Sequence, residues 1–126
     1  MGKSTIGIGL LGMGVVGGGV ASILDDRREQ LSALAGCPVE LKGVLVRDVA
    51  KQRAHRLPAG LITADPRQVL DNPDVDIVVE LMGGQDPALD YILGSVSQGR
   101  HIVTANKEVM ARHGPSILAA ASENGV

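Results

Sequence analysis

Short apolar runs alternate along the chain with longer segments in which apolar residues recur at helical spacing. The runs expected to form buried strands are 6–11, 39–46, 76–82 and 101–104. In the first longer segment, the apolar residues at helical spacing are Val20, Ile23, Leu24, Leu31 and Leu34. Strands that alternate with helices are joined by right-handed crossovers into a parallel sheet covered on both faces. The pattern therefore predicts an α/β fold with a doubly wound parallel sheet.

The first helix is expected to be long and to follow a glycine-rich turn. Its polar face carries the charged run 25–29, and the helix is expected to end at Gly36-Cys37-Pro38. Gly suits the position after a helix and Pro cannot extend one, so two residues independently predict this helix end.

Two Asp-Pro pairs predict further helix starts. Asp is a favourable N-cap residue, and Pro fits the first helical position because its missing N–H would be unpaired there anyway. Asp65-Pro66 therefore predicts a short helix that ends near Leu70. Asp86-Pro87 predicts a helix that ends at Gly99.

The last part of the chain is expected to hold two helices. Ala105-Asn106-Lys107 follows the fourth predicted strand and leads into one of them. Pro115 is expected to open the other, which Asn124-Gly125 ends. Val126 then resembles the first residue of another strand. We expect residues 1–126 to be one domain of a longer protein, since this length fits a single domain.

A G-x-G-x-x-G pattern stands between the first predicted strand and the first helix, at Gly12, Gly14 and Gly17. In this context it is typical of the dinucleotide-binding turn of a Rossmann-type sheet. Gly12 permits the tight turn, Gly14 lets the backbone approach a pyrophosphate, and Gly17 lets helix and strand pack closely. The residues whose backbone N–H groups are expected to face the phosphates are Met13, Val15 and Val16. The alternative is a turn that only tightens the strand–helix connection.

Composition argues against several other classes of protein. The chain has 17 Gly but only one aromatic residue, Tyr91, and its net charge is −2. It therefore lacks both the aromatic platform and the basic surface of a nucleic-acid-binding protein. The single cysteine, Cys37, excludes an intramolecular disulfide and suits a reducing compartment, so we expect a cytoplasmic protein. The three histidines have no metal-ligand spacing, and no metal site is expected.

The segment 4–24 is 21 residues long and uncharged, which is long enough to cross a bilayer. Seven of these residues are Gly, and no clear signal-peptide cleavage site follows them. A strand followed by a phosphate-binding turn explains the same residues better than a membrane span does, so no membrane partner is expected.

The residues that end the second predicted strand decide which dinucleotide fits. An acidic residue there binds the ribose hydroxyls of NAD, whereas an Arg accommodates the 2′-phosphate of NADP. Arg47 stands at this position, and either Lys51 or Arg53 supports it, so the sequence favours NADP. Asp48 keeps NAD open as an alternative, and Arg47 is otherwise a solvated surface charge.

Two further segments follow strands at the same edge of the sheet, where ligands bind in open parallel sheets. They are Gly83-Gly84 and Thr104–Lys107. Lys107 is the best candidate for chemistry, since an ammonium can polarise or protonate a carbonyl oxygen. The alternative for Lys107 is an ordinary helix-surface lysine. We expect Asn106 to be a helix N-cap, and Glu80 to reach solvent or a backbone donor without a catalytic role.

With these segments together, the chain resembles the N-terminal nucleotide-binding domain of homoserine dehydrogenase. The resemblance rests on Gly12-Met-Gly-Val-Val-Gly17, on Val78-Val-Glu-Leu-Met-Gly-Gly84 and on Val103-Thr-Ala-Asn-Lys107. The first motif is shared by very many dinucleotide enzymes. Thr104-Ala-Asn-Lys107 after an E-x-M-G-G strand end is far more specific.

The resemblance implies interconversion of L-homoserine and L-aspartate 4-semialdehyde with NAD(P), in the route to threonine, methionine and isoleucine. It implies that Val15 and Val16 contact the cofactor, Arg47 contacts the 2′-phosphate, and Lys107 contacts the nicotinamide region and the substrate. The family's further essential residues belong to a following substrate-binding and dimerisation domain, so a homo-oligomeric parent enzyme is implied. We accordingly expect the 126 residues alone to bind NADP(H) weakly and to show negligible turnover of homoserine.

Two other functions remain open on the residues alone. A regulatory domain that senses nucleotides would use the same fold without needing Lys107. Another two-domain dehydrogenase with a different small substrate would share the same glycine turn.

Overall fold

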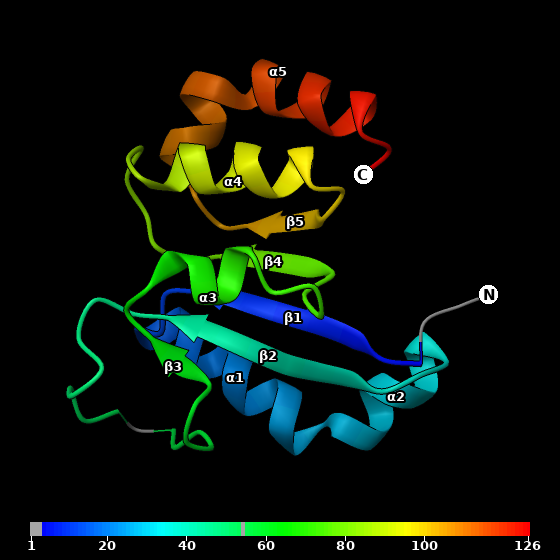
Figure 1. The fold of residues 1–126 in the computed structure, drawn as a ribbon, viewed down its shortest axis with the longest axis vertical. Coiled ribbons are helices and arrows are strands. Elements are labelled where there is room, and N and C mark those ends of the chain that lie inside the picture. The colour runs from blue at the N-terminus through cyan, green and yellow to red at the C-terminus, as the bar shows by residue number, and fades with distance from the viewer. Residues whose placement is uncertain (1–3, 54) are drawn as a thin grey trace.

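A computed structural model describes residues 4–53 and 55–126, and its centre is a parallel five-stranded sheet of order β3-β2-β1-β4-β5 (Figure 1). The strands are β1 (Ile6–Leu11), β2 (Val39–Leu45), β3 (Ile62–Thr63), β4 (Ile77–Glu80) and β5 (His101–Thr104). The predicted α/β fold is confirmed, and β1 and β5 have the predicted bounds. β3 is missing from the predicted strands because two residues are too few to form a periodic pattern.

Helices cover both faces of the sheet. They are α1 (Val15–Asp26), α2 (Arg28–Ala35), α3 (Pro66–Leu70), α4 (Ala88–Ser97) and α5 (Lys107–Glu123). Ala21 of α1 packs with Leu10 on one face, and Val69 of α3 packs with Leu11 on the other. Neighbouring residues of β1 thus point to opposite faces, as a pleated strand requires. α4 lies on the α3 side, and α5 packs on α4 through a separate apolar cluster (Figure 1).

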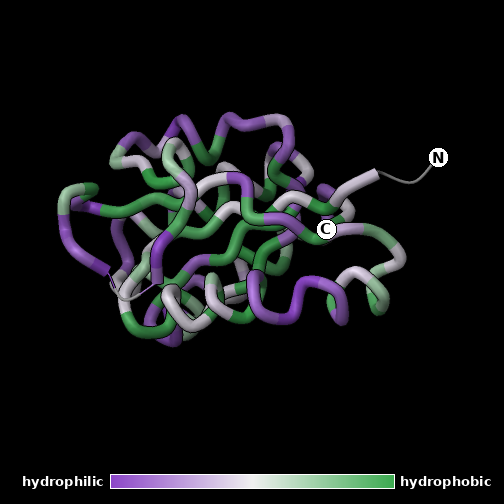
Figure 2. The backbone as a smooth tube through the Cα atoms, turned by 90° about the horizontal axis from the view of Figure 1, so that it is seen from below, coloured by the Kyte–Doolittle hydropathy of each residue, from purple (hydrophilic) through white to green (hydrophobic). Residues whose placement is uncertain are grey.

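Among the described residues, every fully buried apolar side chain is aliphatic. Leu10, Leu11, Val44 and Val78 are all completely enclosed. Hydrophobic segments gather inside the molecule and hydrophilic ones along its periphery (Figure 2). No helix in the described part of the chain has the length and hydropathy needed to cross a membrane.

The prediction of one long first helix is wrong, because α1 and α2 are separate helices that meet at Arg27. The charged run around Arg27 has no apolar side chain to hold a continuous helix against the sheet. An ion pair of 3.2 Å between Asp25 and Arg28 spans the junction. Leu34, expected on the buried side, is 79% exposed. The predicted helix stop is confirmed, since Gly36 has the left-handed φ of 79°.

Of the two Asp-Pro pairs, one behaves as predicted. The carboxylate of Asp65 accepts a hydrogen bond from Arg67 N at 3.0 Å and caps α3. The N-cap prediction for Asp86 is wrong, because α4 begins only at Ala88 and no side chain of the described residues caps it. The carbonyl of Gln85 instead accepts a hydrogen bond from Leu89 N at 2.9 Å.

The prediction that Pro115 opens a separate helix is also wrong. Pro115 lies inside α5, which runs without a break from Lys107 to Glu123. Val109 and Ile117, on either side of the proline, are both buried in the cluster with α4. This shared packing stabilises both halves as one helix despite the hydrogen bond that proline cannot donate.

Candidate functional site

The glycine turn joins β1 to α1 in a tightly packed geometry. Gly12 has a φ of 100°, a conformation that favours glycine, and its N–H donates to the carbonyl of Leu45 at 2.9 Å. A Cβ built on Gly17 would lie 2.2 Å from the carbonyl oxygen of Gly12. A Cβ built on Gly14 would meet no atom within 4 Å. The turn therefore needs glycine at position 17 for close packing, whereas the space beside Gly14 is open.

The start of α1 is open to solvent. Among the described residues no side chain caps this helix, and the side chains of Val15 and Val16 are 96% and 60% exposed. Uncapped N–H groups and the helix dipole together favour an anion at such an end.

A cleft of about 710 Å³ lies in front of this turn, at the carboxyl ends of β1 and β2. Of the predicted site residues it is lined by Gly12, Met13, Gly14 and Arg47. Its walls also include Asp48, Lys51, Arg53, Pro66, Met82 and Tyr91. The predicted site residues outside the lining are Val15, Val16, Gly17, Gly83, Gly84, Thr104 and Lys107. Of the last four, Gly83 and Gly84 follow β4, Thr104 ends β5 and Lys107 begins α5, along the continuation of the same sheet edge.

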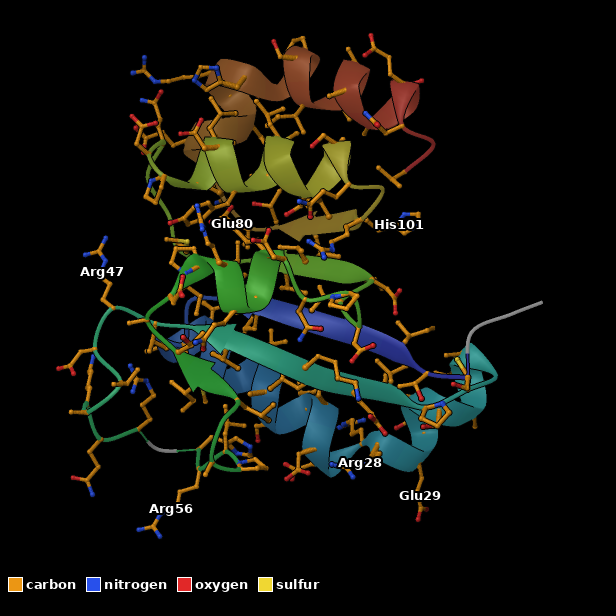
Figure 3. All side chains as sticks on the ribbon, in the orientation of Figure 1. Arg28, Glu29, Arg47, Arg56, Glu80 and His101 are labelled. Atoms are coloured by element: carbon orange, nitrogen blue, oxygen red, sulfur yellow. The ribbon has the colours of Figure 1, made fainter. Side chains whose placement is uncertain are left out.

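Hydrogen bonds from Arg53 to backbone carbonyl groups stabilise the loop after β2. The guanidinium of Arg53 donates to the carbonyl of Asp48 at 2.6 Å and to that of Lys51 at 2.9 Å. The carboxylate of Asp48 accepts a hydrogen bond from Ala50 N at 2.9 Å. Arg47 instead projects outward from the rim of the sheet (Figure 3). Of these charged groups, only Arg47 and Lys51 thus have no hydrogen bond from their side chains to another described residue.

Glu80 ends β4 with a completely buried side chain. Its carboxylate accepts hydrogen bonds from Met82 N at 2.9 Å, Gly83 N at 3.3 Å and Thr104 Oγ1 at 2.6 Å. The expected backbone donors are confirmed, and the alternative of contact with solvent is wrong. The Glu80 side chain lies within the fold, between the sheet and the helices above it (Figure 3).

Asn106 is the N-cap of α5, as predicted, since its Oδ1 accepts from Val109 N at 3.1 Å. It has a second set of contacts that spacing does not reveal. Its Nδ2 donates to Gly84 O at 2.6 Å and to Glu80 at 3.4 Å. The two predicted segments, Gly83-Gly84 and Thr104–Lys107, are thus joined to each other directly.

Lys107 is the first residue of α5 and is exposed. No described side chain forms a hydrogen bond or ion pair with its ammonium group. The neighbouring turn is held to α5 by Gln85, which donates to Glu108 at 3.2 Å and lies 3.2 Å from Nε2 of His113. Lys107 therefore presents a cation on a fixed helix start beside the glycine segment.

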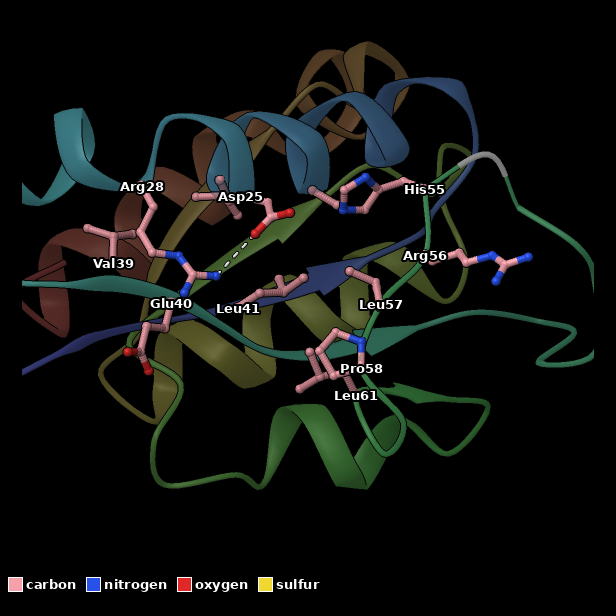
Figure 4. A pocket seen from close by; sticks show the side chains of 12 residues that line it. Asp25, Arg28, Val39, Glu40, Leu41, His55, Arg56, Leu57, Pro58 and Leu61 are labelled. Atoms are coloured by element: carbon pink, nitrogen blue, oxygen red, sulfur yellow. Dashed lines mark hydrogen bonds and ion pairs between the residues drawn. The ribbon is translucent and has the colours of Figure 1, made fainter.

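A second pocket, of about 610 Å³, lies away from this edge between α1, the first half of β2 and the segment 55–61 (Figure 4). Its walls combine aliphatic side chains, Leu24 and Leu41 among them, with charged ones. Asp25 and Arg28 pair with each other on its rim, and Arg56 extends away from it (Figure 4). No predicted site residue lines it.

No group of three or more His, Cys, Asp or Glu side chains within residues 4–53 and 55–126 is arranged to hold a metal ion. The sequence did not reveal that Glu80 also accepts hydrogen bonds from Thr104 and Asn106, nor the second role of Asn106. The available signal was a carboxylate in an apolar strand, since such a group requires buried donors.

Comparison with known proteins identifies close relatives. Residues 12–126 match the family model described as the NAD-binding domain of homoserine dehydrogenase. The homoserine dehydrogenase of Bacillus subtilis is 44% identical over 120 residues, which are 95% of this chain and 28% of that protein. The enzyme of Synechocystis is 46% identical over 122 residues, with 97% of this chain and 28% of that protein covered.

Solved structures agree. A homoserine dehydrogenase from Thiobacillus denitrificans superposes with a TM-score of 0.88 at 41% identity, covering 97% of this chain and 28% of that one. The homoserine dehydrogenase of S. aureus at pH 8.5 gives a TM-score of 0.91 at 35% identity, covering 98% of this chain and 32% of that one. The chain thus spans between a quarter and a third of the length of these relatives.

Proposed function

Since this chain belongs to the homoserine dehydrogenase family, whose NAD-binding domain it matches, we propose that it binds NADP(H) for the interconversion of L-homoserine and L-aspartate 4-semialdehyde. The observation that carries the proposal is the glycine turn, in which Gly17 must be glycine to pack and Gly14 leaves space. That space opens into the cleft in front of an uncapped helix start, as a bound pyrophosphate requires.

The preference for NADP over NAD rests on the loop after β2. Arg47 has an exposed guanidinium with no described hydrogen-bond partner, so it is free to form charge-assisted bonds to a 2′-phosphate. Lys51 lines the same cleft and adds a second cation. Asp48, the residue that would favour NAD, already accepts a hydrogen bond within its own loop.

The cofactor extends along the sheet edge in this proposal. Gly12, Met13 and Gly14 hold the pyrophosphate with Val15, Val16 and Gly17, and Gly83, Gly84 and Thr104 border the nicotinamide end. The order β2-β1-β4-β5 supports this direction, since the ends of these strands follow one another along the edge. The nicotinamide ring supplies the hydride for aldehyde reduction and takes it up in alcohol oxidation.

Lys107 is the residue to which we assign chemistry. Its ammonium would donate a hydrogen bond to the substrate oxygen and stabilise the negative charge that develops there during reduction, and it would then give up one proton to that oxygen to complete the alcohol. One such donor typically contributes about 10²–10³ in rate. The substrate is a small molecule that residues beyond this domain help to orient, and the reaction belongs to amino-acid biosynthesis in the cytoplasm.

Titration of the 126-residue chain with NADPH and NADH, followed by nicotinamide fluorescence, tests the binding proposal. We expect binding of NADPH that Gly14→Ala weakens about tenfold, because the new methyl group enters the space at the turn. Gly19→Ala, which makes the same change where a Cβ meets nothing within 4 Å on α1, should bind normally. Absence of binding by the unmodified chain would reject the proposal.

The reaction is tested in a polypeptide of the relatives' full length. We expect turnover of L-homoserine there and negligible turnover by the 126 residues alone. Comparable turnover by the short chain would contradict the assignment of substrate orientation to residues outside it.

A further inference from the structure

The carboxylate of Glu80 is the centre of a buried hydrogen-bond network. Met82 N and Gly83 N donate to it at 2.9 and 3.3 Å, and Thr104 Oγ1 and Asn106 Nδ2 at 2.6 and 3.4 Å. The side chain is 0% exposed. The four donors come from the ends of two neighbouring strands, so one carboxylate fixes both chain segments.

All four partners of Glu80 are donors, which an ionised carboxylate accepts without conflict. No cation pairs with it in the described part of the chain. The hydrogen bonds alone therefore compensate the burial of this group, and each one matters to the arrangement. A glutamine at this position would lose the negative charge and one acceptor oxygen, so its NH₂ group would face either the Thr104 hydroxyl or the N–H donors.

Asn106 extends the network to the helix that carries Lys107. One side of its amide donates to Gly84 O at 2.6 Å, and the other accepts from Val109 N at 3.1 Å in the first turn of α5. Thr104 Oγ1 adds a further link, since it accepts from Asn106 N at 3.0 Å. The Gly83-Gly84 segment and the start of α5 are thus held in one arrangement.

We propose that Glu80 is a positioning residue that pre-forms the nicotinamide end of the cofactor site by fixing Gly83-Gly84 against the start of α5. The inference rests on the proposed dinucleotide function. In the proposed function the adenosine end lies by the β2 loop around Arg47, and the side chains described for this loop form no hydrogen bond with the Glu80 network. Loss of the Glu80 carboxylate should therefore weaken binding of the nicotinamide half of the dinucleotide and leave binding of the adenosine half unchanged.

The experiment compares two probes on the 126-residue chain, NADPH and adenosine 2′,5′-bisphosphate, which lacks the nicotinamide half. For Glu80→Gln we expect NADPH to bind about tenfold more weakly, with affinity for the bisphosphate unchanged. Glu29→Gln makes the same change on α2, where the side chain points outward (Figure 3), and should alter neither affinity. Unchanged binding of both probes to Glu80→Gln would overturn the inference, as would an equal loss for both.

Asn106→Asp keeps the inference testable if Glu80→Gln does not fold. Asp caps helices as well as Asn does, so the bond from Val109 N is retained. The donor to Gly84 and Glu80 is lost, and a second carboxylate faces the first. We expect the same selective loss of NADPH affinity, and its absence in a folded Asn106→Asp chain would overturn the inference. Failure of the unmodified chain to bind either probe would instead reject the proposed function.

Discussion

The Gly12 carbonyl oxygen lies 2.2 Å from the point where a Cβ on Gly17 would be, so α1 approaches the end of β1 as closely as backbone allows. Gly17→Ala forces the two backbones apart. We expect a loss of at least about 2 kcal/mol in the free energy of unfolding, measured by urea denaturation.

Gly19→Ala is the matched control for this prediction. It lies in the same helix, and its Cβ would meet nothing within 4 Å. Replacing an unstrained helical Gly should raise stability by about 0.5–1 kcal/mol. If both variants are stabilised, close packing of the turn is not what requires glycine at position 17.

Arg100 is a buried cation that caps backbone carbonyl groups rather than a carboxylate. Its guanidinium donates to the carbonyl oxygens of Asn72 at 2.7 Å, Val75 at 3.0 Å and also Leu70. Arg100→Met leaves these acceptors without this donor. We expect a loss of at least about 2 kcal/mol in urea denaturation, since each buried unpaired acceptor costs about 1–3 kcal/mol.

Arg112→Met, on the exposed side of α5, controls for the loss of a cation. It should change the free energy of unfolding by less than about 0.5 kcal/mol. Equal effects of the two substitutions would show that the hydrogen bonds of Arg100 contribute no net stability.

Glu40 and Lys42 form a part-exposed ion pair of 2.8 Å on β2. The hydrogen bond from Lys42, followed by its charge, holds the pKa of Glu40 below its ordinary value of 4.5. The stabilising effect of the pair is therefore present above pH 4.5 and is lost as the pH falls through the lowered pKa. Lys42→Met should raise the pKa of Glu40 toward its ordinary value in an NMR titration, with little change in melting temperature.

Two controls accompany this titration. Lys51→Met removes the same charge elsewhere and should leave the Glu40 titration unchanged. About 1 M salt screens the charge and should also raise the pKa of Glu40 in the unmodified chain. A Glu40 titration that Lys42→Met does not alter would contradict the assigned cause.

The sequence predicts features that local signals mark and misses those that depend on distant contacts. Apolar runs bounded by glycine locate β1, and Asp65-Pro66 locates α3. No Gly or Pro stands at Arg27 to indicate that the helix breaks between α1 and α2. Glu80 and Asn106 are 26 positions apart, so only the folded sheet shows that they share a hydrogen bond. The glycine turn is local and therefore predictable, whereas the network beside it is not.

Lys107→Ala separates the proposed enzymatic role from a regulatory one. In a polypeptide of the relatives' full length we expect kcat to fall about 10²–10³-fold, because one donor to the developing oxyanion is lost. NADPH affinity should change far less. Lys42→Ala, in the middle of β2 and outside the lining of the cleft, should retain full activity. Retention of kcat in Lys107→Ala would overturn the catalytic role assigned to this ammonium.

Arg47→Ala tests the choice between the two dinucleotides. An exposed guanidinium that forms charge-assisted hydrogen bonds to a 2′-phosphate contributes to NADPH binding and nothing comparable to NADH binding. We expect the NADPH affinity of the 126-residue chain to fall about tenfold or more, with the NADH affinity unchanged. Arg56→Ala removes an exposed cation that is not part of the cleft lining, and it should alter neither affinity. Equal affinities for the two dinucleotides, unaffected by Arg47→Ala, would reject the role of Arg47 in binding the 2′-phosphate.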